Sequence, residues 1–308
     1  MTAAPIGLPV FGIVAHEPTD HLDRLVNLLA SSEARILIHI DARRTLREFS
    51  SYQGLDNVNY VRDRVAVNWG AFSQVEASLA MMRVALQEPF GHLVQLSGAD
   101  YPTVEPHELV TRLAAAPRTQ FINLTPMPAP EIGKPITRLS RLHLYEMPRG
   151  SRRPQHLAMH AINRLGIARR YRSRLGGRTP YAGSNWWALT EDAVREVLEV
   201  SQSDRALRDL YRFSRCPDEG YIHTILGAKA HGDRIAPTLT FAEWTRPTGP
   251  QPAWVDDALI DSILEARRTR RSQDARGSAL ILRKFKPDSA SLTERVEREL
   301  WPTPTASS

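Results

Sequence analysis

Two short apolar runs near the N-terminus constrain the fold more than any other feature of the chain. They are VFGIVAH at 10–16 and RILIHID at 35–41, and each ends in polar residues. Continuous apolar runs of this length are typical of parallel strands that are buried on both faces. Between them, residues 20–31 carry apolar side chains at helical spacing behind an acidic start. The chain is therefore expected to open with a strand, a helix and a second strand.

The same alternation continues through the first third of the sequence. We expect a strand at 58–63, a helix at 72–88 that Ser73 caps, and a strand at 92–100. This order predicts an α/β fold in which helices flank a sheet. Ligands of open α/β sheets bind outside the carboxyl ends of the strands, so four residues at or near those ends become candidate site residues: His16, Asp41, Trp69 and Asp100. Taken singly, each also fits a local cap or turn.

Beyond residue 105 the alternation is less regular. The expected elements are a helix at 106–116, strands at 120–127 and 180–190, a helix from 191 that Thr190 caps, and a helix at 217–228. Residues 127–180 are basic and interrupted by proline and glycine, which predicts an insertion that shapes a site. Residues 301–308, WPTPTASS, predict a disordered tail.

The composition limits the kind of protein this chain can be. With 308 residues, of which 42% are hydrophobic, the chain can bury a large core. Its single cysteine, Cys216, excludes an internal disulfide and a cysteine-rich zinc site. No apolar stretch reaches the roughly 18 residues that span a bilayer, and the first residues lack the basic region and cleavage site of a signal peptide. We therefore expect a cytoplasmic protein.

The net charge of +6 indicates anionic partners. Arginines gather at 152–178 and 265–278, with few aromatic residues among them to stack on bases, so we expect no specific nucleic-acid recognition. Solvated helix faces explain most such runs. The first cluster also fits a phosphate-bearing ligand or a peripheral contact with a membrane surface.

The stretch SRCPDEGYIHTIL at 214–226 places Asp218 and Glu219 side by side after Pro217. One interpretation is a helix start, because proline and acidic residues are favoured in the first turn of a helix. The other is a catalytic base. These residues alone leave both interpretations open.

Several blocks of the sequence, in this order, resemble those of one enzyme family: IVAHE, LIHIDAR, VNWGAFSQVEASLAMM, LVQLSGADYPT, YAGSNWWALT and CPDEGYIHTIL. The family is that of the core-2/I-branching β-1,6-N-acetylglucosaminyltransferases, which also includes peptide O-xylosyltransferases and many bacterial members. The resemblance spans roughly residues 10 to 230, and LILRKFKP at 280–287 is similar to the closing block of the family.

The resemblance implies a GT-A-like fold, with a mixed sheet flanked by helices in a single domain over 1–300. Residues 1–125 would form the half that binds the nucleotide sugar. Residues 126–300 would form the acceptor-binding half, including a basic C-terminal segment, and 301–308 would be the tail. The implied reaction is transfer of a sugar from a UDP-sugar to a hydroxyl with inversion at the anomeric carbon. Glu219 would be the base, and Asp218 a helix cap or a support that orients the site.

The chemistry of inversion agrees with a site of this kind. A single displacement needs one carboxylate near the attacking hydroxyl and positive charge near the departing diphosphate. The sequence contains no Asp-x-Asp motif, which in many GT-A enzymes holds a metal at the diphosphate. As in the family it resembles, we therefore expect no metal and no cofactor besides the donor. Three cations would bind the diphosphate: Lys284, Arg283 beside it, and Arg246.

The resemblance also assigns the remaining donor contacts. It places Val14, His16 and Asp41 at the uracil and ribose, where a strand-end carboxylate can accept hydrogen bonds from ribose hydroxyls. Trp69 would lie near the donor. The sugar transferred is N-acetylglucosamine or xylose.

For the acceptor, Trp186 and Trp187 offer faces that stack on sugar rings, and at most one of them should face the site because side chains alternate along a strand. Further acceptor contacts are expected from Asp100 and from three residues of the insertion: Arg138, Arg141 and His143. Ser184 is expected to support the site structurally. The acceptor is a glycan, a glycolipid or a glycosylated small molecule. The alternative function is a non-catalytic carbohydrate- or polyanion-binding protein with the same fold.

Overall fold

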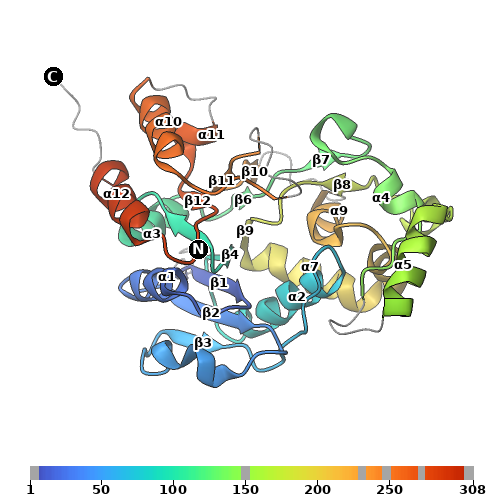
Figure 1. Cartoon of the computed structure of the whole chain (residues 1–308), viewed down its shortest axis with the longest axis horizontal. Helices are drawn as coiled ribbons and strands as arrows, with labels where there is room; N and C mark the ends of the chain where they lie inside the picture. The colour runs from blue at the N-terminus through green and yellow to red at the C-terminus, as the bar shows by residue number, and fades with distance from the viewer. Residues whose placement is uncertain (1–6, 147–152, 228–233, 245–250, 270–274, 302–308) are drawn as a thin grey trace, which may run out of the picture.

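A computed structural model describes residues 7–146, 153–227, 234–244, 251–269 and 275–301. Within these ranges a seven-stranded sheet runs through the molecule in the order β10-β6-β9-β4-β1-β2-β3 (Figure 1). Its strands are β1 (Val10–Ala15), β2 (Arg35–Ile40), β3 (Val58–Tyr60), β4 (His92–Ser97), β6 (Gln120–Phe121), β9 (Ala188–Thr190) and β10 (Ile235–Ala236). The sheet is mixed, since β9 runs antiparallel to both of its neighbours.

The expected parallel core of the sheet is confirmed. Strand β1 lies between β2 and β4 and is parallel to both, with Val14 opposite His39 on one side and Ser97 on the other. Because the three strands share one direction, the residues that follow them meet at the same edge of the sheet. The candidates His16, Asp41 and Asp100 all follow these strand ends.

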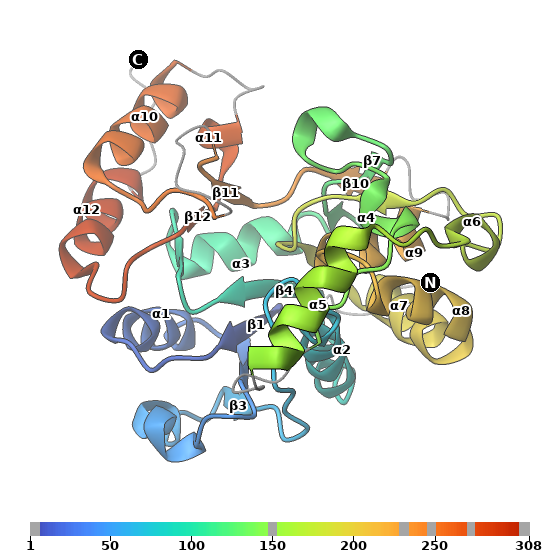
Figure 2. The same cartoon turned by 45° about the vertical axis from the view of Figure 1, so that its right-hand side comes forward.

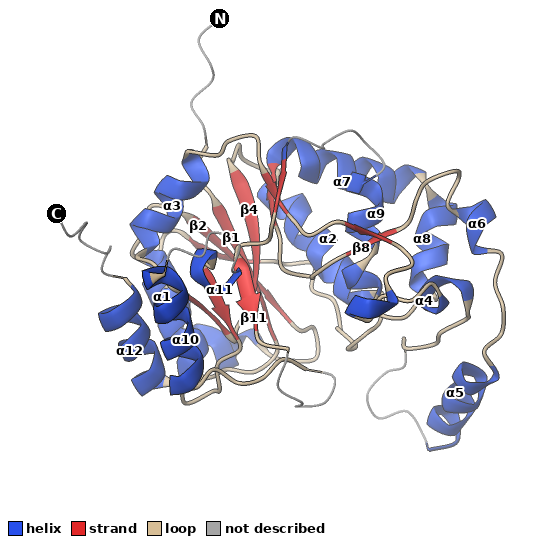
Figure 3. Ribbon diagram, turned by 90° about the horizontal axis from the view of Figure 1, so that it is seen from above, coloured by secondary structure: helices blue, strands red, loops and turns tan. Residues whose placement is uncertain are grey.

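Helices cover both faces of the sheet, as Figure 3 shows. One face carries α1 (Asp20–Ala30), α3 (Pro106–Ala114), α10 (Asp257–Arg268) and α12 (Ala290–Leu300), and the other carries α2 (Ser73–Ala85), α7 (Glu191–Ser203), α8 (Arg205–Arg212) and α9 (Tyr221–Gly227). Each group of helices packs on one face of the sheet to form a buried hydrophobic cluster, the first with α1 and the second with α2. Side chains alternate along a strand, so Phe11 and Ile13 of β1 belong to the first cluster and Val10 belongs to the second. Each cluster buries residues from both halves of the chain.

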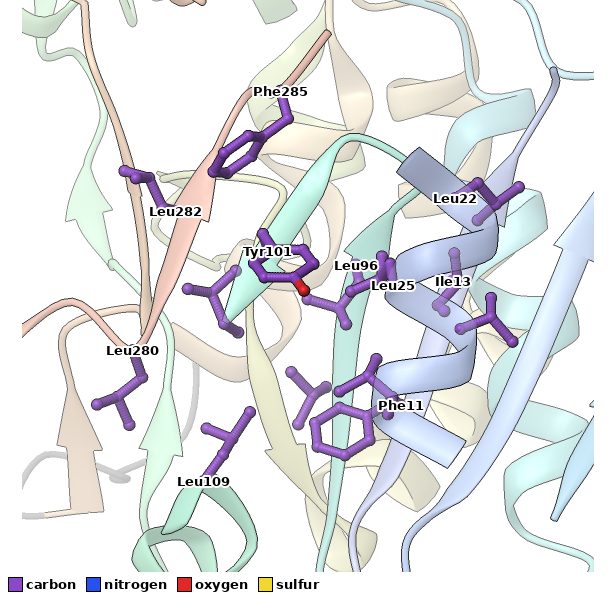
Figure 4. Close-up of a cluster of buried hydrophobic side chains, with 14 of the residues drawn as sticks. Phe11, Ile13, Leu22, Leu25, Leu96, Tyr101, Leu109, Leu280, Leu282 and Phe285 are labelled. Carbon is purple, nitrogen blue, oxygen red and sulfur yellow. The ribbon is translucent and has the colours of Figure 1, made fainter. Parts of the chain in front are cut away.

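A second sheet joins the C-terminal segment to this core. Its strands β11 (Thr240–Ala242), β12 (Ile281–Arg283) and β5 (Asp100–Pro102) lie in the order β11-β12-β5, with β12 antiparallel to β5. Figure 4 shows Leu282 and Phe285 packed around Tyr101, near the side chains of β1 and α1. The expected tail begins later than residue 301, because Trp301 packs on this cluster and its Nε1 donates to the Pro102 carbonyl at 3.3 Å. Residues 302–308 lie outside the described residues.

Three elements expected after residue 115 are each split into two shorter ones. The strand expected at 120–127 is split between β6 and β7 (Thr125–Pro126), and the one expected at 180–190 is split between β8 (Tyr181–Ala182) and β9. The helix expected at 217–228 is split into a 3₁₀ turn, η3 (Pro217–Glu219), and α9. Each split places irregular backbone next to the candidate site residues.

Two expected helix caps are wrong, because each hydroxyl bonds a group outside its helix. Helix α2 has Phe72 at its N-cap position, and the Ser73 hydroxyl instead accepts from the Asn68 N–H at 2.9 Å. Thr190 does occupy the N-cap position of α7, but its hydroxyl accepts from Gln120 Nε2 at 2.7 Å rather than from the helix.

The insertion at 127–180 lies on the side of the molecule that comes forward in Figure 2. It holds η2 (Pro130–Ile132), α4 (Thr137–Ser140), α5 (Arg153–Leu165) and α6 (Tyr171–Arg174), and two further short helices lie elsewhere: η1 (Leu46–Tyr52) and α11 (Ala275–Ser278). In the described part of the chain, no helix combines the length and apolar character needed to cross a membrane.

Candidate active site

The two adjacent carboxylates lie on a tight turn rather than in the first turn of a helix. Cys216, which precedes the turn, has φ of 49°, in the left-handed region, and Gly220 separates the turn from α9. Asp218 and Glu219 therefore point from the same short 3₁₀ turn into different surroundings. The helix-start interpretation holds only for the 3₁₀ turn itself, which Pro217 opens and which contains both acids. It does not hold for α9, because Gly220, with φ of −150°, interrupts the helical backbone between the turn and that helix.

Glu219 is bound by two cations from the insertion. Lys134 Nζ and Arg138 Nη1 both contact the same carboxylate oxygen, Oε2, the latter at 2.5 Å. The Glu219 side chain is 23% exposed, and no hydrogen bond within the described residues involves Oε1. Burial acts to raise the pKa of Glu219, but the charges and hydrogen bonds of Lys134 and Arg138 outweigh it and lower the pKa. The carboxylate is therefore ionised at neutral pH with one oxygen unoccupied by these contacts.

Asp218 has the opposite environment. It is 8% exposed, and within the described residues its Oδ1 has no hydrogen-bond partner. Burial, followed by the charge of Glu219, raises the pKa of Asp218 to about 7. Within the described residues, no backbone N–H of α9 donates to this carboxyl, so Asp218 does not cap that helix, and its role as a support for the site stays a prediction.

A chain of contacts joins the end of β2 to the Glu219 turn. Arg43 bonds Asp41 with Nε and Nη2, at 2.9 and 2.8 Å, and donates from Nη1 to Asn68 Oδ1 at 3.2 Å. Two residues further along, the Gly70 carbonyl accepts from the Cys216 N–H at 3.2 Å. The loop that precedes α2 therefore connects the edge of the sheet at the end of β2 to the turn that holds Glu219.

Asp41 is already saturated with hydrogen bonds. Besides Arg43, the Val67 N–H donates to Asp41 Oδ2 at 3.1 Å. Burial tends to raise the pKa of Asp41, but the hydrogen bonds from Arg43 and Val67 lower it overall. The carboxylate is thus a charged support for the loop, and its expected contact with ribose stays a prediction.

A second chain of contacts begins at the end of β4. The Asp100 carboxylate is fully buried, accepts from the Ser97 N–H at 2.7 Å and binds Arg283 Nη1 at 2.6 Å. The guanidinium of Arg283 lies over the ring of Trp186, with its Cζ 4.0 Å from the ring centroid. Direct acceptor binding by Asp100 is therefore corrected to positioning of Arg283, because its carboxylate is enclosed.

The same chain continues from Trp186 to Glu219. The Trp186 N–H donates to Ser184 Oγ at 3.2 Å, and the Gly183 N–H donates to the Glu219 carbonyl at 3.0 Å. Gly183 tolerates no side chain, since a Cβ there would lie 1.9 Å from the Asn123 carbonyl oxygen. Ser184 thus stands in the supporting position expected of it.

The two tryptophans differ as expected, although neither belongs to a strand. Trp187 is 2% exposed and packs in the second buried cluster, whereas Trp186 is half-buried beside Arg283. Only Trp186 has a surface that a ligand can reach. Trp187 is therefore a core residue and its assignment to the acceptor is wrong.

The ammonium group of Lys284 contacts an amide and an aromatic ring. Its Nζ contacts Gln251 Oε1 and lies 4.0 Å from the ring centroid of Trp254, and within the described residues it forms no ion pair. Burial and then the charge of Arg283 lower the pKa of Lys284. Its charge is thus not neutralised by a carboxylate, whereas that of Arg283 is. Arg246 lies outside the described residues.

The remaining candidates vary in exposure. At the edge of the sheet, Val14 is half-buried, His16 is exposed and Trp69 is 58% exposed, directly before Gly70. In the insertion, Arg141 lies against Gly166 instead of Glu219.

His143 lies near Arg141 in the insertion and is engaged with the backbone. Its Nε2 lies 3.0 Å from the Thr137 carbonyl, and burial lowers its pKa. Of the three insertion residues expected at the site, the structure brings only Arg138 to Glu219.

Sequence reasoning missed Lys134, Arg43 and Asn68. Lys134 follows Gly133, whose φ of 72° reverses the chain so that Ala129 and Lys134 pair. A Gly-Lys-Pro turn inside a basic insertion marks a chain reversal, but it gives no sign of a partner 85 residues away. Among the described residues, no group of three His, Cys, Asp or Glu side chains is placed to hold a metal ion.

Known proteins of one family match this chain. A model of the Core-2/I-Branching enzyme family matches residues 10–265. Similar proteins include Xylosyltransferase 2 of Homo sapiens and of Rattus norvegicus, each 26% identical over 259 and 258 residues, and Xylosyltransferase oxt of Drosophila melanogaster, 24% identical over 244 residues. These matches cover 81%, 80% and 73% of this chain but only 28%, 28% and 25% of the relatives.

The chain therefore spans little more than a quarter of the length of the curated relatives it matches. The family match, in contrast, covers most of the chain, and the mixed sheet flanked by helices is consistent with a GT-A-like glycosyltransferase fold. The chain belongs to the Core-2/I-branching enzyme family of glycosyltransferases.

Proposed function

We propose that this protein transfers a sugar from a UDP-sugar to a hydroxyl of a glycan, glycolipid or glycosylated small molecule, with inversion, without a metal and with Glu219 as the base. The observation that carries the proposal is the meeting of two contact chains at the Glu219 turn. One starts at Asp41 and passes through the Gly70 carbonyl, and the other starts at Asp100 and passes through Trp186. Both begin at the sheet edge where the donor is expected.

The state of Glu219 suits a general base. Lys134 and Arg138 keep the carboxylate ionised, so it can accept a proton, and both bind Oε2. Oε1 is then the atom that would receive the proton of the acceptor hydroxyl as that oxygen attacks the anomeric carbon. The two cations lower the basicity of Glu219 but hold it in one orientation. A single ionised carboxylate is sufficient for this displacement because the nucleotide is a good leaving group.

Positive charge for the leaving diphosphate is proposed to come from Lys284. Neither Lys284 nor Lys286 of the C-terminal block forms an ion pair with a described carboxylate, but Lys286 is exposed to solvent, whereas Lys284 is buried beside Arg283. A lysine can bond phosphate oxygens directly and so perform the task of a metal ion. The missing Asp-x-Asp motif supports the proposal that no metal is required.

The donor sugar is proposed to be xylose or N-acetylglucosamine. The named relatives are xylosyltransferases, which supports xylose, whereas the family name refers to branching enzymes. A cytoplasmic location is proposed on the single cysteine of the chain, which fits a reducing compartment.

The decisive test is Glu219→Gln, with Glu131→Gln as the control. Glu131 is an exposed glutamate of η2 in the same insertion. Radiolabelled UDP-sugars are supplied with a panel of glycoside acceptors, and UDP binding is measured by calorimetry. We expect Glu219→Gln to lower transfer by roughly two to four orders of magnitude while UDP still binds. Wild-type turnover in this variant would show that Glu219 is not the base.

A protein that binds sugars or polyanions without turning over any UDP-sugar would support the alternative function. Loss of UDP binding in Glu219→Gln would likewise contradict the proposal, because a base on the acceptor side should leave the nucleotide site intact.

A further inference from the structure

Helix α5 presents an apolar stripe that the described part of the protein does not cover. Leu157, Ala161 and Leu165 are four residues apart and so lie on one face of the helix. Leu157 is 69% exposed and Leu165 is 74% exposed, and Ile167 just beyond the helix is 44% exposed. Met159 and Ile162 are half-buried, on the face turned toward the protein. The helix lies at the edge of the molecule, away from the main sheet (Figure 1, Figure 3).

The sequence around this stripe is strongly basic. Between Glu146 and Glu191 there are nine arginines and no aspartate, glutamate or lysine. Two of the arginines serve the fold: Arg169 donates to the carbonyls of Phe213, Asp209 and Leu210, and Arg178 binds Asp204 at 2.7 Å.

Four other arginines of the segment are exposed: Arg164, Arg170, Arg172 and Arg174. They form no ion pair with any described residue. Their charge is therefore available to an outside partner. Only Arg164 belongs to α5, and the other three arginines follow the helix in the chain. An apolar helix stripe joined to a segment of uncompensated arginines is a combination that favours the interface of an anionic bilayer.

We propose that α5 and the segment up to Arg174 dock onto an anionic lipid bilayer, with Leu157, Leu165 and Ile167 inserted among the acyl chains. The arginines would attract the lipid headgroups, and the leucines would gain from leaving water. A soluble polyanion is disfavoured because it gives the leucines no apolar surroundings. A second copy of the chain is disfavoured because it would bring another arginine-rich face against the first.

Backbone hydrogen bonds join the docking segment to the candidate active site. The Leu142 N–H donates to the Ile167 carbonyl at 2.8 Å, and the Arg215 N–H donates to the carbonyl of Arg138 at 3.1 Å. Arg138 in turn binds Glu219. Docking would thus hold the Glu219 site close to the bilayer surface, where a glycolipid presents its sugar. That consequence rests on the proposed function, whereas the docking itself does not.

The test is sedimentation of the whole chain with vesicles, in the absence of donor and acceptor. Vesicles of phosphatidylcholine mixed with phosphatidylglycerol are compared with pure phosphatidylcholine. We expect binding to the anionic vesicles only, weakening as NaCl is raised. Leu157→Ser with Leu165→Ser should weaken binding about tenfold or more. Arg170→Gln with Arg172→Gln should weaken it about 25-fold, or about fivefold for each charge removed.

The controls are substitutions of similar kind elsewhere on the surface. Leu46→Ser in η1 and Arg298→Gln in α12 should leave vesicle binding unchanged, and circular dichroism checks that every variant is folded. Equal binding to neutral vesicles, or no binding to either, would overturn the proposal.

Two other results would reassign the surface. Heparin binding that needs the arginines but not the leucines, without vesicle binding, would assign it to a soluble polyanion. A dimer in ultracentrifugation that Leu157→Ser abolishes, without vesicle binding, would assign it to a second copy. UDP binding is measured in parallel, so that failure of docking is distinguishable from failure of the proposed function.

Discussion

Replacing Asp218 by asparagine tests whether this buried carboxyl is a cost to folding. Burial and the charge of Glu219 raise the pKa of Asp218 to about 7, against about 3.9 for an aspartate in an unfolded chain. The folded protein therefore binds this proton more tightly than the unfolded chain does. The cost of ionisation is absent below the unfolded pKa and grows as the pH rises toward the folded pKa. A difference of about three units amounts to ~4 kcal/mol once both states are ionised.

The free energy of unfolding of wild type and of Asp218→Asn is measured in urea at pH 5 and pH 8. From the two pKa values, the cost in the wild type is about 1.5 kcal/mol at pH 5 and about 4 kcal/mol at pH 8. Asparagine is neutral at both, so the variant should gain about 2.5 kcal/mol on the wild type between them. Any constant cost of burying the amide cancels in this difference.

The control is Asp192→Asn, whose side chain is exposed on α7 and so carries no comparable cost of burial. A first-turn position with a favourable charge predicts the contrary result: asparagine caps a helix as well as aspartate does, so the variant would lose only the charge, about 0.3–1 kcal/mol at both pH values. A pH-independent loss of this kind would refute the reasoning from burial.

Three further expectations concern the candidate site. Burial acts to raise the pKa of Glu219 and Lys134 acts to lower it. Lys134→Met should therefore move the acid limb of the kcat/KM profile to higher pH. An unchanged acid limb would show that Lys134 does not control the pKa of the base. Lys284→Ala should weaken UDP binding and slow transfer, whereas Lys286→Ala, an exposed neighbour, should do neither; calorimetry that shows equal affinities would place the phosphate contact elsewhere. UDP should raise the melting temperature equally with and without EDTA, and a need for Mn²⁺ or Mg²⁺ would contradict metal-independent binding.

The sequence predicts the first third of the fold well because local and long-range requirements agree there. The runs that become β1, β2 and β4 are apolar on both faces, and their burial in a parallel sheet is the only way to remove them from water. In the second half, the strands are two or three residues long. Such short pieces leave no readable period, since their pairing depends on backbone partners far away in the chain.

The candidate site shows the same limit in its side chains. The strand ends correctly indicate where Asp41 and Asp100 lie, yet both carboxylates are occupied by arginines, Arg43 and Arg283. A sequence shows that a carboxylate lies at a strand end, but it does not show whether a cation from another segment forms an ion pair with it. Arg283 is 183 residues from Asp100 in the chain, so no local motif marks the pair.

The Glu219 turn shows how such distant partners set the surroundings of the proposed base. Its side chain is held by Lys134 and Arg138 of the insertion, its carbonyl by Gly183, and the preceding Cys216 by Gly70. These anchors come from three separate segments, so loss of any one leaves the others to keep the carboxylate in place. Removal of a cation should consequently change the basicity of Glu219 more than its position. The family blocks identify which glutamate to examine, and the insertion, which those blocks do not include, determines its protonation.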